Sequence, residues 1–160
     1  MLRPSEKDIK YLSWVVQGAK IFSTCGKRQY MAMIVDQHGY VVGVGYNGTP
    51  VGFTHCIDGG CPRLNADSDP GSSYDNCLAN HAEQNAIMNA FTRDSMRHGT
   101  IYVNGEPCFT CAKLLANTGI ECLVYTSDPE YVYEGWPKVD EFLRDAGMMR
   151  RYIPMENLYV

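Results

Sequence analysis

Residues 107–111 read Pro107-Cys108-Phe109-Thr110-Cys111, and residues 81–83 read His81-Ala82-Glu83. Each stretch follows a loop and comes at the start of an expected helix. Cysteines three positions apart at a helix N-terminus face the same way, so they can bind one tetrahedral ion, and a histidine adds a third ligand. Three protein ligands leave a fourth position for water, which is typical of catalytic zinc sites. The two stretches therefore predict a catalytic metal bound by His81, Cys108 and Cys111.

Glu83 lies two residues after the histidine, where a helix turns its side chain away from the ligand direction. A carboxylate in that place can take a proton from water and return it to another atom. We therefore expect Glu83 to be the catalytic proton carrier. The alternative is a capping carboxylate beside a surface histidine and an unrelated pair of thiols, which the joint rarity of the two motifs disfavours.

The pattern of apolar residues around these motifs predicts alternating helices and strands. Ser5 and Asp8 have the spacing of a capping box at the start of a first helix. Asn80 is the expected cap of the helix that carries His81. Strands are expected at residues 31–35, 40–46, 100–104, 121–126 and 149–153. Further helices are expected at 81–92, 107–118 and 137–146, and a long loop at 47–80. This order predicts an α/β fold with a partly parallel sheet and helices packed on its faces.

Length and composition limit the classes of protein further. A chain of 160 residues predicts one domain, residues 1–160, with a loop rich in Gly, Pro and Cys at 47–80. Eighteen acidic and 14 basic residues give a net charge of −4, which disfavours a protein that mainly binds a polynucleotide. The sequence shows neither a leader nor a membrane-spanning run, so we expect a cytoplasmic protein without a membrane partner. Seven cysteines, an odd number, favour free thiols or metal ligands over a disulfide framework.

The two metal motifs match the H-x-E…P-C-x-x-C signature of zinc nucleobase deaminases. Residues 23–29, 46–50 with Gly52-Phe53, and 81–86 extend the likeness, so that residues 5–153 resemble the deoxycytidylate (dCMP) deaminase family within the cytidine and deoxycytidylate deaminase superfamily. The resemblance implies a three-layer cytidine deaminase-like fold, with a central mixed sheet of about five strands and helices on both faces.

The same resemblance implies hydrolysis of dCMP to dUMP and ammonia, which supplies dUMP for thymidylate synthesis. Zinc would lower the pKa of a bound water, and Glu83 would carry the water's proton to N3 of cytosine and then to the leaving amino group. It further implies dCTP and dTTP as effectors, Mg²⁺ with a nucleotide effector, a homohexamer, and the cytosol of a bacterium or of a phage-infected host. Two alternatives stay open: a deaminase of cytidine, guanine or transfer-RNA adenosine, and a non-catalytic zinc-binding assembly protein, which Glu83 disfavours.

Three residues are candidates for binding the substrate. Asn47 ends an expected strand before Gly48, and in the resembling family an Asn at this place contacts the sugar; a plain Asn-Gly turn is the alternative. Arg28, next to Lys27, is a candidate for the 5′-phosphate, although a solvated pair of charges is an equal alternative. Tyr125, at the end of another expected strand, either lines the base or phosphate or packs in the core.

Four cysteines, Cys25, Cys56, Cys61 and Cys77, lie in or near the long loop. Phage-type members of the resembling family carry a second, structural zinc in this region, and such an ion would keep a loop of this composition ordered. The candidate ligands are Cys25, Cys56, Cys77 and either Cys61 or His55; reduced thiols and a disulfide are the alternatives. Cys122 lies in an apolar strand and is expected in the core. The polar residues 65–73 depart from the family pattern, so no effector-binding residues are assigned.

Overall fold

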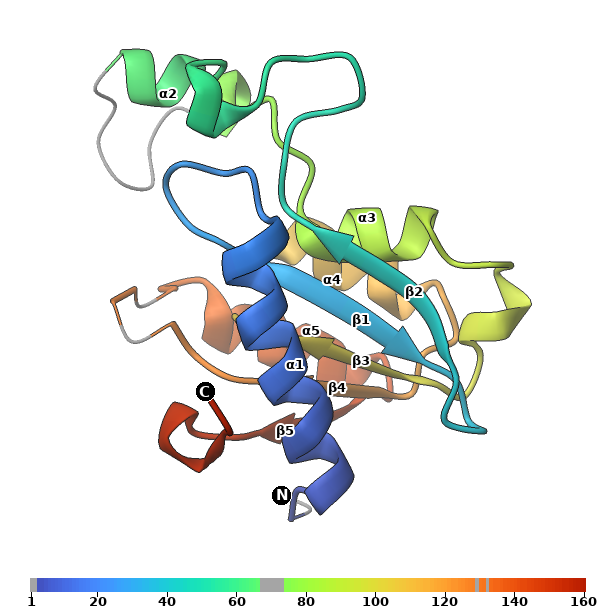
Figure 1. Ribbon diagram of the computed structural model, residues 1–160. Coiled ribbons are helices and arrows are strands. Elements are labelled where there is room, and N and C mark those ends of the chain that lie inside the picture. The colour runs from blue at the N-terminus through green and yellow to red at the C-terminus, as the bar shows by residue number, and fades with distance from the viewer. Residues whose placement is uncertain (1–2, 67–73, 129, 132) are drawn as a thin grey trace.

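The computed structural model describes residues 3–66, 74–128, 130–131 and 133–160. Apart from α2 (Pro62–Asn65), a short helix inside the segment expected as a loop, its helices and strands follow the order expected from the sequence (Figure 1). They are α1 (Glu6–Phe22), β1 (Met31–Val35), β2 (Val41–Tyr46), α2 (Pro62–Asn65), α3 (Ala82–Met88), β3 (Thr100–Val103), α4 (Phe109–Ala116), β4 (Cys122–Tyr125), α5 (Trp136–Asp145) and β5 (Met149–Tyr152). No helix within these ranges has both the length and the apolar character needed to span a membrane.

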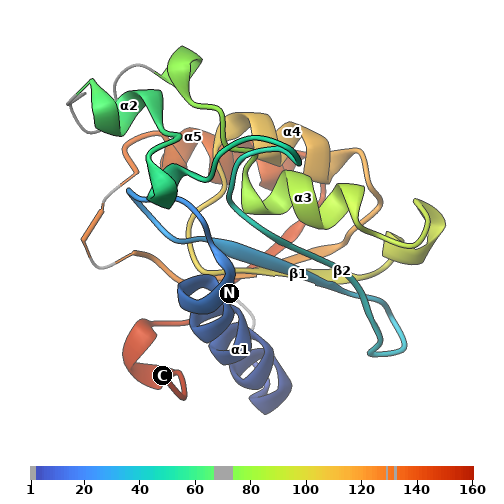
Figure 2. The same ribbon diagram turned by 45° about the horizontal axis from the view of Figure 1, so that its top comes forward.

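The five strands form one mixed sheet in the order β2-β1-β3-β4-β5. β1 is antiparallel to both of its neighbours, whereas β3, β4 and β5 are mutually parallel. β2, β3 and β4 therefore run in the same direction, and their carboxyl ends lie at one edge of the sheet. Figure 2 shows α1 on one face of the sheet and α3, α4 and α5 on the other. This three-layer arrangement confirms the predicted fold class.

Strand β1 shows how the sheet forms a core on both faces. Its five residues are all buried. Because successive side chains of a strand point to opposite faces, Met31, Met33 and Val35 pack in the cluster that includes α1. Ala32 and Ile34 pack in the cluster that includes α3, α4 and α5. The continuous apolar run of β1 is thus explained by helices on both sides.

The boundaries of the two motif-bearing helices differ from those expected. The helix expected at 81–92 is α3, which ends at Met88 and has His81, not Asn80, as its N-cap. It ends early because the following chain joins the sheet edge, where Phe91 N–H donates to the Val42 carbonyl at 3.2 Å. The helix expected at 107–118 begins at Phe109, after the N-cap Cys108, and ends at Ala116. The expected strands and the helix near residue 140 agree with the structure to within one residue.

The long loop at 47–80 contains short helical segments that project away from the sheet (Figure 1). Its two ends meet at the sheet, where Gly48 N–H donates to the Asn80 carbonyl at 3.3 Å and Asn80 N–H donates to the Gly48 carbonyl at 2.9 Å. The loop therefore starts and ends beside the residues that precede α3. Of the polar insertion at 65–73, residues 67–73 lie outside the described residues.

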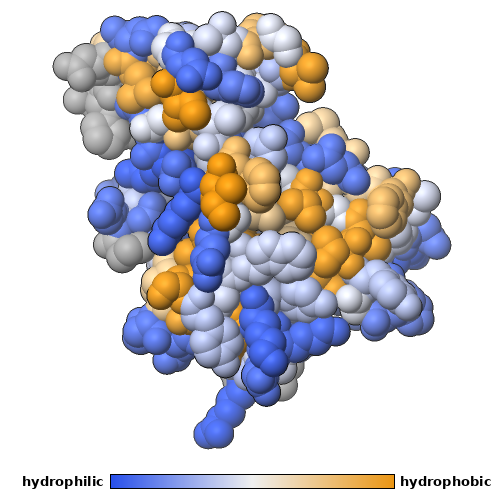
Figure 3. Space-filling model, viewed as in Figure 1, coloured by the Kyte–Doolittle hydropathy of each residue, from blue (hydrophilic) through white to orange (hydrophobic). Residues whose placement is uncertain are grey.

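The ends of α1 and β2 lie side by side. Figure 3 shows a surface on which hydrophilic and hydrophobic side chains are mixed. Ile21, Phe22 and Tyr46 are exposed hydrophobic residues at these two ends, and the rings of Phe22 and Tyr46 stack with centroids 6.0 Å apart. This ring contact joins the end of α1, which precedes the segment 23–30, to the end of β2, which precedes Asn47.

A buried carboxylate attaches α1 to the sheet. The predicted capping box is present, since Asp8 N–H donates to Ser5 Oγ at 3.1 Å and Ser5 N–H donates to Asp8 Oδ2 at 2.8 Å. The Asp8 side chain also accepts hydrogen bonds from the Tyr102 hydroxyl at 3.0 Å and from Arg151 Nη1 at 2.9 Å. Burial alone would raise the pKa of Asp8, but the bonds from Ser5 and Tyr102 and the charge of Arg151 lower it below its ordinary value.

We expect Asp8→Asn to lower the free energy of unfolding by about 2–4 kcal/mol at pH 7, because Arg151 loses a buried ionic partner. Folding lowers the pKa of Asp8, so its contribution is present above about pH 4 and is lost as the pH falls through the folded pKa. Urea unfolding at pH 7 and below pH 4 measures both effects. The control is Glu6→Gln, which removes an exposed ion pair with Lys10 that solvent screens, so its stability should change little. Equal losses in the two variants would contradict the role of Asp8.

Candidate metal centre and active site

The three expected metal ligands lie at the N-termini of two helices. His81 has extended backbone angles, φ −74° and ψ 154°, as the N-cap of α3, and its N–H donates to Gln84 Oε1 at 2.8 Å. Cys108 is the N-cap of α4, and Cys111 lies in the first turn of that helix. α4 follows β3, so both cysteines lie near the carboxyl edge of the sheet. A site at this edge is the usual one in open α/β sheets.

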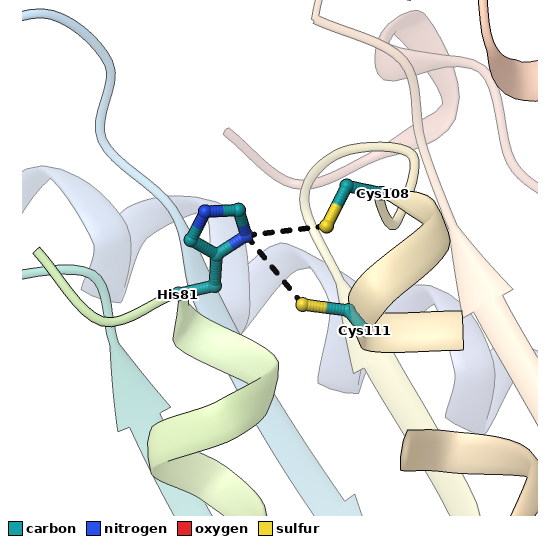
Figure 4. A group of neighbouring side chains, drawn as sticks. All are labelled: His81, Cys108 and Cys111. Carbon is teal, nitrogen blue, oxygen red and sulfur yellow. Dashed lines mark hydrogen bonds between the residues drawn. The ribbon is translucent and has the colours of Figure 1, made fainter. Parts of the chain in front are cut away.

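The side chains of His81, Cys108 and Cys111 converge (Figure 4). Nδ1 of His81 lies 3.5 Å from the sulfur atom of each cysteine. The three donor atoms all lie within 4.8 Å of one another, and the described residues contain no other such group of three. A tetrahedral zinc ion with ordinary bond lengths would separate its nitrogen and sulfur ligands by about 3.6 Å. The arrangement therefore fits a zinc ion.

Hydrogen bonds among these three side chains shift their pKa values, which shows that they share protons in a place that a cation could occupy. The pKa of Cys108 is lowered to about 4, chiefly because the Cys111 side chain donates a hydrogen bond to its thiolate and His81 adds a second one. The same interaction with Cys108, together with burial, raises the pKa of Cys111. The pKa of His81 is raised by its hydrogen bond with Cys108, which outweighs the effect of burial. A metal ion would take the place of the protons shared among these donors.

Glu83 reaches the same site from the first turn of α3. It is only 5% exposed, and burial raises the pKa of its carboxyl group. Its side chain is in hydrogen-bonding contact with Cys111 and interacts with the charges of His81 and Cys108. The structure thus brings a carboxyl group to the three donor atoms, in a place where little water can reach it.

Asn47 is buried at the carboxyl end of β2, where its side chain holds the segment 23–30. Its Oδ1 accepts hydrogen bonds from Ser23 Oγ and, at 2.9 Å, from Tyr30 N–H. Its Nδ2 donates to the Arg28 carbonyl at 2.8 Å. These bonds use both lone pairs of Oδ1 and one of the two hydrogens on Nδ2. Asn47 is therefore a structural link, and among the described residues the second hydrogen on Nδ2 has no acceptor.

Arg28 is held by groups from the chain after β4. Its guanidinium lies 3.7 Å from the centre of the Tyr131 ring, and its Nε lies 3.7 Å from Asp128 Oδ2. The Tyr30 hydroxyl donates to the same carboxylate oxygen at 3.4 Å. Arg28 is thus stacked on an aromatic ring and paired with a partly exposed carboxylate.

Tyr125 lies in the core cluster on the α3, α4 and α5 side of the sheet. Its ring packs against Trp136 and Tyr152, with centroid distances of 4.8 Å and 5.4 Å. It is 7% exposed, and burial raises the pKa of its hydroxyl to about 12. The sequence left open whether this ring lines the substrate or packs in the core, and in the structure it packs in the core.

The four loop cysteines gather around Cys56. The Cys56 and Cys61 side chains are hydrogen-bonded, and burial, Cys61, Cys25 and Cys77 together raise the pKa of Cys56 to about 12. Cys56 and Cys61 are buried, whereas Cys25 and Cys77 are half-buried, and none of the four forms a disulfide. His55 instead has Nδ1 3.5 Å from Thr49 Oγ1. Cys122 lies in the core beside α1, as expected.

Sequence reasoning missed two polar residues that shape this edge of the sheet. Asn104 follows β3, where its Oδ1 accepts from Met31 N–H at 2.7 Å and its Nδ2 donates to the Gln29 carbonyl at 2.9 Å. Asp128 comes three residues after β4 and pairs with Arg28. A usable signal was present, because polar residues just after the carboxyl ends of strands often border the ligand site of an α/β sheet.

Known proteins are similar to this chain in sequence. The deoxycytidylate deaminase of Schizosaccharomyces pombe is 38% identical over 136 residues, which cover 84% of this chain and 41% of the relative. That of Mycobacterium phage D29 is 36% identical over 124 residues, which cover 74% of this chain and 94% of the relative. This chain likewise spans only 39% of the length of the Saccharomyces cerevisiae deoxycytidylate deaminase.

A crystal structure of the dCMP deaminase of cyanophage S-TIM5, in complex with dCMP and dUMP, has the same fold. The TM-score is 0.71 at 23% identity, over 96% of this chain and 100% of the other. Residues 5–127 match the family described as the cytidine and deoxycytidylate deaminase zinc-binding region. Because that match includes His81, Glu83, Cys108 and Cys111, the chain belongs to the zinc-binding cytidine and deoxycytidylate deaminase family.

Proposed function

We propose that this protein is a zinc-dependent enzyme that deaminates dCMP to dUMP and ammonia, with residues 1–160 acting as one domain. The observation that carries the proposal is the buried carboxyl group of Glu83 beside the His81–Cys108–Cys111 donor group. A purely structural metal site needs no carboxylate next to an open ligand position. The choice of dCMP is supported by relatives that are deoxycytidylate deaminases, one of which this chain covers almost completely.

The chemistry follows from the position of Glu83. When bound, zinc lowers the pKa of water and so supplies a nucleophile at neutral pH. Glu83 accepts a proton from the water that attacks C4 of cytosine and delivers this proton to N3. Glu83 then carries the remaining hydroxyl proton to the 4-amino group. The C4–N bond breaks, a C4 carbonyl forms, and the amino group leaves as ammonia.

Substrate binding is assigned to the same edge of the sheet. Asn47 is assigned as a donor to the sugar, because within the described part of the chain one hydrogen on Nδ2 has no acceptor, while its other bonding capacity is used within the protein. Arg28 is assigned to the 5′-phosphate, since its guanidinium offers paired donors and is held in place by Tyr131 and Asp128. Tyr125 supports this edge from the core and is assigned no direct contact.

We expect Glu83→Gln to retain its metal and to lose kcat by about 10²–10⁴-fold, because the variant can no longer accept a proton. Release of ammonia from dCMP measures the rate, and elemental analysis measures the metal. Glu121→Gln is the matched control, since Glu121 is exposed and pairs with His98 at the surface. A Glu83→Gln variant within tenfold of wild-type kcat would overturn the assignment.

We expect Arg28→Gln to raise KM for dCMP by about 10–100-fold, because a phosphate loses a charge-assisted partner. Turnover of deoxycytidine, which has no phosphate, should change little. Arg93→Gln is the control, since Arg93 lies in the chain between α3 and β3 and donates to the Asn117 carbonyl. Assaying dCMP, deoxycytidine, cytidine and guanine in parallel also tests the substrate. Preference for guanine or for cytidine over dCMP would reject dCMP as the substrate.

We also propose a second, structural zinc in the long loop, with Cys25, Cys56, Cys61 and Cys77 as its ligands. The support is the hydrogen bond between the buried Cys56 and Cys61 and the nearness of Cys25 and Cys77, which both raise the pKa of Cys56. The four sulfur atoms are more widely spaced than the donor atoms of His81, Cys108 and Cys111, so an ion would draw them together. His55 is disfavoured because its ring lies beside Thr49. A metal there would stabilise the loop, because the free energy of binding a structural metal adds to the free energy of folding.

Elemental analysis is expected to find two zinc ions per chain in the wild type and one in Cys56→Ser. Cys122→Ser, which changes a buried thiol in the sheet core, is expected to keep both. Cys56→Ser should also make the loop more susceptible to limited proteolysis, because a structural metal contributes folding free energy. A wild-type protein with one zinc per chain would reject the second site.

Regulation and assembly are proposed on family membership alone. They comprise activation by dCTP, inhibition by dTTP with Mg²⁺, and a homohexamer. The polar residues 65–73 depart from the family pattern, and residues 67–73 lie outside the described residues. No effector contact is therefore assigned to this stretch.

A further inference from the structure

The outer edge of the sheet is closed by the α3 segment. β2 is an edge strand, and its outer carbonyl groups point away from β1. Such groups normally bond to water or to another strand. Here three of them accept hydrogen bonds from side chains or backbone of the chain after His81. The bonds are Asn85 Nδ2 to Tyr46 O at 2.7 Å, Asn89 Nδ2 to Val44 O at 2.9 Å, and Phe91 N to Val42 O at 3.2 Å.

The two asparagine bonds depend on a match between helix and strand spacing. Residues four apart on a helix are separated by about 6 Å along its axis. Residues two apart on a strand are separated by about 6.7 Å. α3 runs antiparallel to β2, so Asn85 and Asn89 meet the carbonyls of Tyr46 and Val44 in turn. The helix therefore acts as a partner to the strand through its amide side chains.

Glycine and alanine bring the helix close enough for these bonds. A Cβ atom on Gly45 would lie 2.2 Å from the backbone nitrogen of Ala86 and 2.5 Å from the carbonyl oxygen of Ala82. A Cβ atom on Gly43 would lie 2.5 Å from the carbonyl oxygen of Ala86. No side chain fits at either position, so α3 lies directly against the backbone of β2 (Figure 2).

The Asn85 bond joins the two segments that carry the site. Its acceptor is the carbonyl of Tyr46, the residue before Asn47. Its own N–H donates to the His81 carbonyl at 3.0 Å, one helical turn from the metal ligand. Glu83 lies between His81 and Asn85 in the sequence. By contrast, the Asn89 bond lies one turn farther along α3, at Val44.

We infer that Asn85 is a positioning residue for the reaction. Its side-chain amide fixes the carboxyl end of β2 against the first turn of α3, and so fixes Asn47 relative to His81 and Glu83. The inference rests on the proposed function, because it concerns groups that act on the nucleotide and the metal. Small displacements matter for such groups, since a misplacement of about 1 Å can lower a rate about 100-fold.

Asn85→Leu tests the inference, because leucine keeps the approximate size of asparagine but lacks the amide donor. Asn89→Leu is the matched control, with the same type of bond made by the C-cap residue of the same helix. We expect both variants to lower the melting temperature. At a temperature where both are folded, Asn85→Leu is expected to lower kcat for dCMP by about 10–100-fold, whereas Asn89→Leu keeps the wild-type kcat.

Metal release to a chelator provides a second readout that needs no substrate. We expect Asn85→Leu to release its catalytic metal about 10-fold faster than Asn89→Leu, since His81 is held by the turn that Asn85 anchors. Equal kcat values and equal release rates in the two variants would overturn the inference. If the wild-type protein does not deaminate dCMP, the proposed function fails, and a faster metal release from Asn85→Leu still supports the positioning role.

Discussion

The approach of two thiol sulfurs to within 3.5 Å of one imidazole nitrogen is the constraint on which the other features of this edge depend. The histidine begins α3 and the cysteines begin α4, so two helices must start at the same place. The sheet order makes this possible. β2 and β3 flank β1 and run in the same direction, α3 packs antiparallel to β2, and α4 follows β3. Both N-termini therefore lie at one edge.

Helix N-termini suit this site electrostatically. Their unpaired N–H groups and the helix dipole favour negative charge, which is what metal-binding thiolates carry. The low pKa of Cys108 is consistent with that environment, since a backbone N–H also contributes to it. Glu83 has the opposite tendency, because burial raises the pKa of its carboxyl group. The site thus places a thiolate that can bind a metal ion beside a carboxyl group that can hold a proton.

Two asparagines at the strand ends organise the segment that carries Arg28. Asn47 after β2 binds the Arg28 carbonyl and the Tyr30 N–H. Asn104 after β3 binds the Gln29 carbonyl and the Met31 N–H. A side-chain amide can donate and accept at once, so each asparagine replaces a missing strand partner on one side of this segment. The backbone next to Arg28 is thereby fixed by both neighbours of β1.

Local patterns in the sequence were sufficient to predict the α/β fold, the order of the elements and the convergence of His81, Cys108 and Cys111. Helical and strand periodicity and the spacing of metal ligands each depend on residues close together in the chain. The end of α3 at Met88, the pairing of Arg28 with Asp128, the packing of Tyr125 and the bonds of Asn85 to β2 were decided only by the tertiary structure. Each of these features depends on a partner that is distant in sequence, and no local spacing encodes which distant residue comes within hydrogen-bonding or packing distance.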